Sequence, residues 1–253
     1  MSEILTTEMA PSPDISHIIT EDNTPVDNFG SEKQQRLLTR VLYSSWTGPD
    51  DSQKFLVAAN VGVFTAIAQP PIVPDVFLSL DVGVAENWWE KKNRSYFVWE
   101  FGKPPEVVIE IVSNREGNEL GSKLRDYERM RVSYYVVFDP IQQLGGPVLQ
   151  IYQLQGTRYL PMTDTWLEQV GLGLTLWRGV FEDKEDVWLR WCDKDGNLIP
   201  TGTERAELAE SQLRQTESQL QETESLLEQE RRRSELLTER LRALGIDPEQ
   251  LNG

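Results

Sequence analysis

The amino-acid sequence predicts an α/β (α+β) protein, in which a mixed sheet is flanked by helices and followed by a long C-terminal helix. Two observations carry this prediction. Residues 107–140 show a buried strand, an amphipathic helix and a second buried strand, the pattern of a crossover between parallel strands. Residues 203–243 contain no Pro or Gly and are rich in Glu, Gln, Arg and Leu, which is typical of a long polar helix.

The composition indicates a folded protein without a membrane segment. Of the 253 residues, 39% are hydrophobic, which is enough to fill a core. No apolar run reaches the length of a membrane span, and the N-terminus lacks the basic start and apolar segment of an export signal. We therefore expect a cytoplasmic protein that does not bind membranes.

Two residue types limit the chemistry. Cys192 is the single cysteine and His17 the single histidine, so an internal disulfide and a Cys/His zinc site are both excluded. A metal would have to be held by carboxylates, which suit magnesium or manganese.

The net charge of −16 argues at first against nucleic acid as a partner, because phosphate-binding surfaces are normally basic. Its distribution weakens this argument. Residues 1–30 carry six acids and no Lys or Arg, and residues 203–253 carry twelve acids against seven Arg. Residues 31–202 then hold 23 acids and 18 basic residues, so the middle of the chain is only mildly acidic.

The first third of the chain is expected to contain a leader, a helix and two strands. Residues 1–30 are rich in Pro, Thr and Asp without periodicity, as in flexible segments. In residues 31–46 apolar side chains recur at helical spacing after Ser31, the predicted N-cap. Residues 55–68 and 74–84 are predicted strands, and an aromatic, charged insertion follows them.

The next predicted strand, PPEVVIEIVS at residues 104–113, contains a carboxylate among β-branched side chains. Side chains alternate along a strand, so Glu110 shares a face with Val108 and Val112, while the other face is also apolar. An ionised carboxylate removed from water is costly unless it is paired, hydrogen-bonded or metal-bound. Glu110 therefore needs a partner.

The elements that follow complete the predicted domain. Residues 117–131 form a helix with Leu120, Leu124 and Tyr127 on its apolar side, and residues 132–140 form the second buried strand. Residues 148–192 are expected to form short antiparallel strands. We place the domain at residues 31–200.

The C-terminal helix is assigned to residues 203–244, followed by a tail at 245–253. Leu213, Leu220 and Leu227 repeat every seven residues and define a coiled-coil seam that is weak in its middle. This pattern fits either a solvated helix or one that pairs with a second copy or a partner helix.

Three polar residues lie where a purely structural role does not explain them. Asp75 follows Pro74 at the entry to a strand, Glu110 lies within a strand, and Lys123 lies on the inward stripe of the following helix. Two carboxylates and a lysine that meet at one end of a sheet can bind a divalent metal, present a water molecule and stabilise an oxyanion.

These segments resemble the Uma-two family, restriction-endonuclease-like proteins of the PD-(D/E)XK nuclease superfamily that are abundant in cyanobacteria. The resemblance rests on PD at 74–75, PEVVIEIVS at 105–113 and KLRDYERMRVSYYVVFDP at 123–140. It covers residues 31 to about 200, and the C-terminal tail also resembles those of such proteins. It implies a restriction-endonuclease-like fold.

The resemblance also implies site residues and an activity. Asp75, Glu110 and the backbone carbonyl of Ile111 would bind Mg²⁺ or Mn²⁺, and Lys123 would be the catalytic lysine of an endonuclease that hydrolyses phosphodiester bonds, with DNA as the expected substrate. One departure concerns Val112, which occupies the position of the superfamily's usual lysine. The resemblance implies that Lys123 has replaced it from the helix.

Three further features remain open. The insertion contains Trp88, Trp89, Tyr96, Phe97 and Trp99 interleaved with Lys91, Lys92 and Arg94, which fits either nucleic-acid contact or packing over a sheet edge. Tyr127 either lines the site or fills the core, and Glu32 is a second candidate acid. The rival function is a catalytically silent scaffold that acts through its coiled coil, and a third interpretation is an RNA or repair nuclease that uses the same site.

Overall fold

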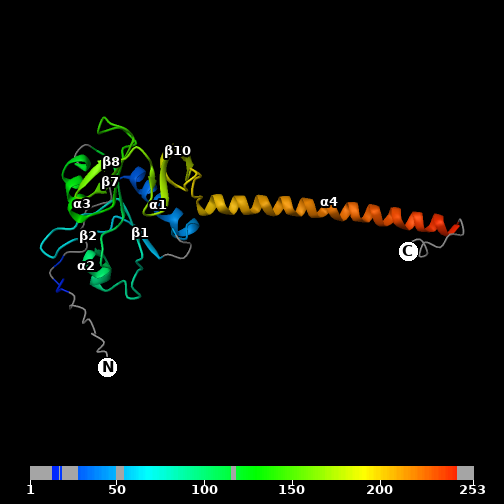
Figure 1. The fold of residues 1–253 in the computed structure, drawn as a ribbon, viewed down its shortest axis with the longest axis horizontal. Coiled ribbons are helices and arrows are strands. Elements are labelled where there is room, and N and C mark those ends of the chain that lie inside the picture. The colour runs from blue at the N-terminus through cyan, green and yellow to red at the C-terminus, as the bar shows by residue number, and fades with distance from the viewer. Residues whose placement is uncertain (1–12, 17, 19–27, 50–53, 115–117, 244–253) are drawn as a thin grey trace, which may run out of the picture. The chain divides into compact units, whose positions relative to one another are not determined.

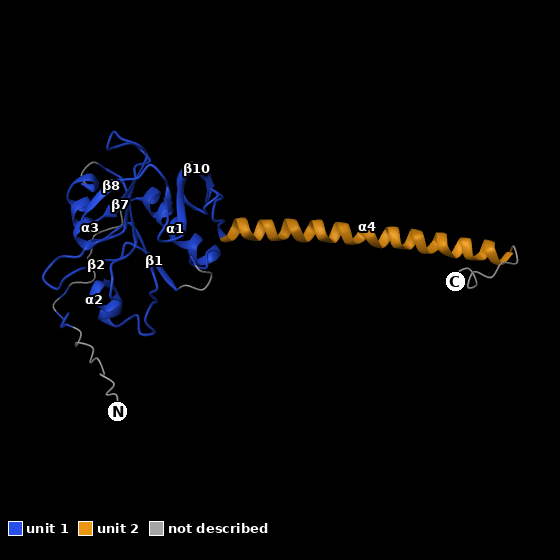
Figure 2. Cartoon of the chain, viewed as in Figure 1, with its two compact units in different colours: residues 1–201 blue, residues 202–253 orange. Residues whose placement is uncertain are grey.

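The computed structural model describes residues 13–16, 18, 28–49, 54–114 and 118–243 (Figure 1). The chain divides into two compact units, residues 1–201 and residues 202–253 (Figure 2). Most of the predicted leader, including His17, and the predicted tail lie outside the described residues. Within the described residues, no helix combines the length and the apolar composition that crossing a membrane requires.

The first unit is built on a six-stranded sheet (Figure 1). Its strands, in order across the sheet, are β1 (Phe55–Ala59), β3 (Val76–Leu80), β5 (Val107–Ile111), β6 (Tyr134–Phe138), β7 (Leu149–Gln155) and β8 (Arg158–Pro161). β5 and β6 are parallel, whereas the other neighbouring pairs in this sheet are antiparallel. The predicted mixed sheet and crossover are therefore confirmed.

Two smaller sheets accompany the large one. β9 (Trp166–Leu167), β10 (Leu172–Phe181) and β11 (Lys184–Cys192) form an antiparallel sheet, and β2 (Val63–Phe64) pairs in parallel with β4 (Tyr96–Phe97). The antiparallel arrangement predicted for residues 148–192 is correct, but β10 and β11 are longer than expected.

Helices cover the large sheet. α1 (Phe29–Ser45) packs on β1 and β11, and the crossover between β5 and β6 contains η2 (Glu119–Lys123) and α3 (Leu124–Met130). The insertion forms two short helices, η1 (Lys91–Asn93) and α2 (Val98–Phe101). α1 starts earlier than predicted, because its N-cap is Asn28, whose side chain accepts a hydrogen bond from the backbone N–H of Ser31 at 2.9 Å.

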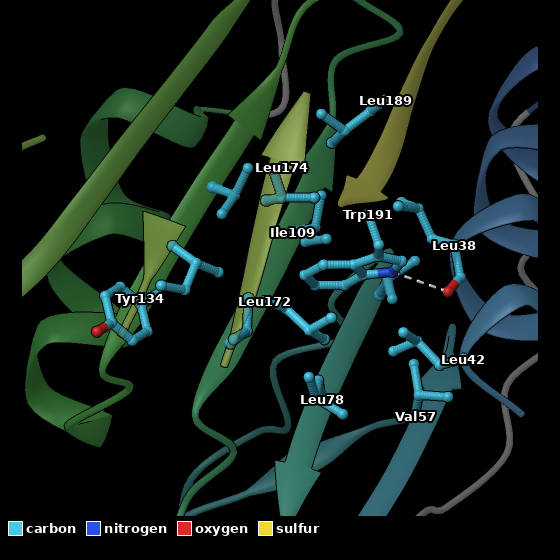
Figure 3. Close-up of a cluster of buried hydrophobic side chains, with 14 of the residues drawn as sticks. Leu38, Leu42, Val57, Leu78, Ile109, Tyr134, Leu172, Leu174, Leu189 and Trp191 are labelled. Carbon is cyan, nitrogen blue, oxygen red and sulfur yellow. Dashed lines mark hydrogen bonds between the residues drawn. The ribbon is translucent and has the colours of Figure 1, made fainter. Parts of the chain in front are cut away.

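Strand β5 is buried on both faces. Val107, Ile109 and Ile111 belong to one core, which Figure 3 shows around Trp191 and Leu38. The Trp191 indole N–H donates to the Leu38 carbonyl at 2.9 Å, which ties β11 to α1 (Figure 3). Val108 and Val112 lie in the second core, together with Tyr127 of α3. Glu110 lies two residues from each of these valines along the strand, so its side chain is on the same apolar face, as predicted.

Two local predictions are wrong. The strand expected at 55–68 is interrupted at Asn60, which adopts a left-handed conformation with φ of 55°. Leu120 is 42% exposed, whereas Glu119 is buried. Residues Glu119–Lys123 form a π-helical turn, which shifts the inward face relative to α-helical spacing.

The second unit contains one long helix, α4 (Gly202–Ala243). None of its residues is buried, and Leu213, Leu220 and Leu227 are all exposed. These three leucines of the predicted seam are therefore open to solvent in the described residues of this unit.

Candidate active site

The register of β3 and β5 brings Asp75 and Glu110 together. Val76 pairs with Ile109, so extending this antiparallel register by one residue sets Asp75 directly across from Glu110. Directly opposed residues of an antiparallel pair project to the same face of the sheet. The two carboxylates predicted from the sequence therefore occupy neighbouring positions on one face.

Glu110 has two partners from the following helical segment. The Lys123 ammonium donates to Oε2 of Glu110 at 2.9 Å, and the Tyr127 hydroxyl donates to Oε1 at 2.6 Å. Glu110 itself is only 1% exposed. Lys123, the last residue of the π-helical turn, thus meets Glu110, and Tyr127 contacts the carboxylate as well as filling the core.

Asp75 is held by the end of β5 and by helix α1. Its Oδ2 accepts the backbone N–H of Ile111 at 2.7 Å, and its Oδ1 accepts the side-chain amide of Gln35 at 2.8 Å. The carbonyl of Gln35 in turn accepts the side-chain amide of Asn60 at 2.8 Å. Sequence reasoning missed Gln35, although a polar residue on the buried stripe of a helix was an available signal.

Glu119 is the second residue that sequence reasoning missed. Its Oε1 lies 3.8 Å from the Lys123 nitrogen, so the ammonium lies near two buried carboxylates. Oε2 of Glu119 is buried and has no hydrogen-bond partner in the described part of the chain. The Tyr135 hydroxyl donates to the Glu119 backbone carbonyl at 3.0 Å and fixes the start of the π-helical turn.

The surroundings set the protonation of these groups. Burial raises the pKa of Glu110 to about 7, although the charge of Lys123 opposes this effect. For Lys123, burial lowers the pKa, but the charges of Glu110, Glu119 and Asp75 outweigh burial and leave the pKa above its ordinary value. Burial, together with Glu110, also holds the pKa of Tyr127 well above its ordinary value. Lys123 is thus cationic and Tyr127 is a donor at neutral pH.

The donor set fits a hard divalent cation. Among the residues that the structure describes, no three acidic, histidine or cysteine side chains form a complete metal-binding group. Mg²⁺ does not require one, since it is commonly bound through one or two carboxylates and completes its coordination with water and phosphate oxygens. Asp75 and Glu110 supply the carboxylate oxygens that such an ion prefers, and each Glu110 oxygen, with two lone pairs, accepts one of the hydrogen bonds from Lys123 and Tyr127.

Other candidate residues are placed as follows. Val112, at the position of the superfamily's usual lysine, is buried in the second core. The amine beside Glu110 belongs to Lys123 instead. Glu32 forms an ion pair with Arg36 at 2.9 Å, and the α1 residue that contacts Asp75 is Gln35 instead. Asp139 is buried at the end of β6, where it accepts two backbone N–H groups of the following turn.

The mixed sheet with its crossover and the acidic site next to a helical lysine are the features that we expect of a restriction-endonuclease-like protein. The model of the Uma2 family, described as "putative restriction endonuclease", matches residues 18–178. The chain therefore belongs to this family, which is the one its motifs resemble. No match was found among curated proteins, and none among solved structures.

Proposed function

We propose that the protein is a metal-dependent endonuclease that hydrolyses phosphodiester bonds of DNA. The observation that carries this proposal is the convergence of Asp75 and Lys123 on Glu110, a carboxylate buried within the central strand β5. Burying an acid at a core position is costly even when it is paired, and carboxylates with a pKa perturbed by burial and by neighbouring charges cluster at functional sites. Membership of a restriction-endonuclease family supports the same reaction class.

Asp75, Glu110 and the backbone carbonyl of Ile111 would hold Mg²⁺ or Mn²⁺. When bound, such an ion lowers the pKa of a coordinated water and neutralises charge on a phosphate. Asp75 is kept in place by Gln35 and by the Ile111 N–H, so its orientation is set by α1 and β5.

Lys123 would stabilise negative charge that develops on the phosphate. Its ammonium is fixed beside Glu110 and is 31% exposed, so it can contact a substrate that approaches from solvent. Tyr127 would hold the Glu110 carboxylate through its 2.6 Å hydrogen bond. Tyr127 is therefore a positioning residue in this scheme.

The experiment is a plasmid-nicking assay in Mg²⁺ or Mn²⁺ with the wild type and the variants Asp75→Ala, Glu110→Ala and Lys123→Ala. We expect the wild type to nick DNA and each variant to lose at least two orders of magnitude in rate. Equal cleavage by all four proteins would indicate contamination and refute the proposal.

A second candidate function, a silent scaffold, is favoured by α4, whose seam leucines Leu213, Leu220 and Leu227 are exposed. Residues 203–230 carry eight acids and two Arg, whereas residues 231–243 carry five Arg and two acids. In a parallel pair of these helices the two acidic segments would lie against each other, and the two copies of Glu230 would face each other in the seam. We therefore propose that α4 binds a second copy of itself in the antiparallel orientation, in which opposite charges face.

Dimerisation and nuclease activity are compatible, so the two candidate functions are separated by the cleavage assay. A protein that dimerises through α4 but nicks no DNA under any metal condition would be a scaffold. Activity that depends on Asp75 and Glu110 would assign it as a nuclease, with α4 as its means of assembly.

A further inference from the structure

A pocket of about 380 Å³ is lined by residues of β1, β3 and the aromatic insertion, and by none of Asp75, Glu110 and Lys123. Aromatic rings form much of its wall and two cations lie at its rim; these residues are Phe77, Trp88, Tyr96, Phe101, Lys92 and Arg94. Its size is within the range of pockets that hold small organic groups. Nothing in the catalytic scheme above uses it.

The sheet places this pocket next to the two carboxylates. Phe77 follows Asp75 by two residues on β3, so the two side chains share a face and are spaced by about 7 Å along the strand. Phe77 pairs with Val108, which precedes Glu110 by two residues on the same face of β5. A substrate group that binds in the pocket would therefore be the part of the substrate next to the bond that the site would cleave.

The wall of the pocket is rigid. The Tyr96 ring stacks on Phe101 with centroids 4.3 Å apart and meets Phe77 edge-on at 5.2 Å. The buried Tyr96 hydroxyl is fixed by Ser79 at 2.9 Å and by the Lys103 carbonyl at 3.0 Å. These aromatic side chains are thus preorganised rather than free to collapse into the space.

The rim is open and carries an accessible ring. Trp88 is 56% exposed and lines the pocket, whereas its neighbour Trp89 is 74% exposed and does not. Lys92 and Arg94 are exposed on the same segment. Planar rings beside exposed cations are the combination that binds single-stranded nucleic acid, in which a base stacks and the adjoining phosphate meets the cation.

We infer that this pocket binds one unstacked nucleobase of a single-stranded segment, with Trp88 stacking on the base and Lys92 and Arg94 contacting the adjoining phosphates. The inference rests on the proposed function and narrows its substrate to nucleic acid with an unpaired nucleotide beside the cleaved bond. The Lys92 ammonium lies 3.4 Å from the Glu90 carboxylate, and Arg94 donates through Nε to the Trp89 carbonyl at 2.7 Å, but both side chains are exposed. Exposed cations beside stacked rings favour an anionic strand over an apolar peptide side chain as the occupant.

The test measures binding without cleavage, in EDTA and again in Ca²⁺, by fluorescence anisotropy of a labelled oligothymidylate and of a blunt duplex. We expect Trp88→Ala to weaken single-strand binding by roughly 10-fold and Trp88→Phe to restore most of it. Trp89→Ala is the control for a neighbouring exposed ring that does not line the pocket; the two rings meet edge-on at 5.8 Å, so it should weaken binding, but by clearly less than Trp88→Ala. Lys92→Gln should lower the slope of log K against log salt by about 0.7.

Two results would overturn the inference: equal effects of Trp88→Ala and Trp89→Ala, or an equal effect of Trp88→Ala on the duplex. Because no cleavage is measured, this test is independent of the nicking assay. A protein that nicks DNA but shows no Trp88 effect would lack the base pocket, whereas one that binds through Trp88 but cuts nothing would lack the proposed activity.

Discussion

The pair of Lys123 and Glu110 makes a prediction that depends on pH. In Lys123→Met the buried carboxylate of Glu110 loses the ammonium that lies 2.9 Å away but keeps the Tyr127 hydroxyl. Leaving one partner of a buried ion pair alone costs about 3–5 kcal/mol. Lys123 is 31% exposed, and solvent weakens its interaction, so we expect about 2 kcal/mol of lost stability at pH 9.

The sign of the pH dependence follows from the pKa of Glu110, which is raised from 4.5 to about 7 in the folded protein. A raised carboxyl pKa means that the folded state binds the proton more tightly than the unfolded state. The contribution of this proton binding to the unfolding free energy is fully present below about pH 4.5 and is lost as the pH rises through about 7. Without Lys123 the folded pKa is higher still, so the loss grows further above pH 7.

The assay is urea unfolding of the metal-free protein in EDTA at pH 5 and pH 9. At pH 5 Glu110 is protonated in both proteins, so the difference between their unfolding free energies should be smaller than at pH 9. The difference that remains at pH 5 reports the loss of the ammonium beside Glu119. The matched control is Arg129→Met, which removes an exposed ion pair with Asp126 on the same helix and should cost less than about 0.5 kcal/mol at either pH. The reasoning is refuted if Lys123→Met costs the same at pH 5 and pH 9, or no more than Arg129→Met at pH 9.

The remaining predictions concern α1, β5 and α4. Gln35→Ala and Gln34→Ala each remove buried hydrogen bonds and should each lower the unfolding free energy by about 1–3 kcal/mol. Only Gln35→Ala should slow cleavage, by roughly 10-fold, because Gln34 bonds to β11 instead of Asp75. Equal cleavage rates of the two variants would contradict a positioning role for Gln35. Glu110→Gln should remove most of the stability loss of the metal-free protein between pH 5 and pH 8, measured by urea unfolding, and an unchanged pH dependence would show that another group titrates. For α4, the double variant Leu213→Cys/Leu237→Cys should form a disulfide-linked dimer on non-reducing gels while both single variants do not; a dimer from Leu213→Cys alone would indicate a parallel pair.

Glu110 and Lys123 attract attention in the sequence because each is a charged residue in an apolar pattern. A carboxylate in a run of β-branched residues and a lysine on an inward helical stripe are both visible without a structure. Their meeting follows from the short crossover, whose helix must pack on the strand before it. The structure confirms that the two side chains form a hydrogen-bonded ion pair.

Other parts of the site could not be derived in this way. The spacing of Leu120 and Leu124 predicts an α-helix, and only the π-helical turn in the structure explains why Glu119 is buried and Leu120 exposed. The position of Gln35 on the buried stripe of a helix indicates that it needs a polar partner, but that this partner is Asp75 follows only from how α1 packs against the sheet. The opposition of Asp75 and Glu110 depends on the register of β3 and β5, which residue patterns did not fix.

The central claim is that Asp75 is a functional carboxylate of a nuclease, and Asp139 offers a matched comparison. Both are buried aspartates that accept backbone N–H groups at the end of an inner strand of the same sheet, Asp75 before β3 and Asp139 after β6, but only Asp75 lies beside Glu110. The decisive measurement is the single-turnover cleavage rate of Asp75→Asn and Asp139→Asn across a Mg²⁺ titration, with folding checked by circular dichroism. The account predicts at least a 100-fold loss for Asp75→Asn and a near wild-type rate for Asp139→Asn. Equal rates for the two folded variants would contradict it.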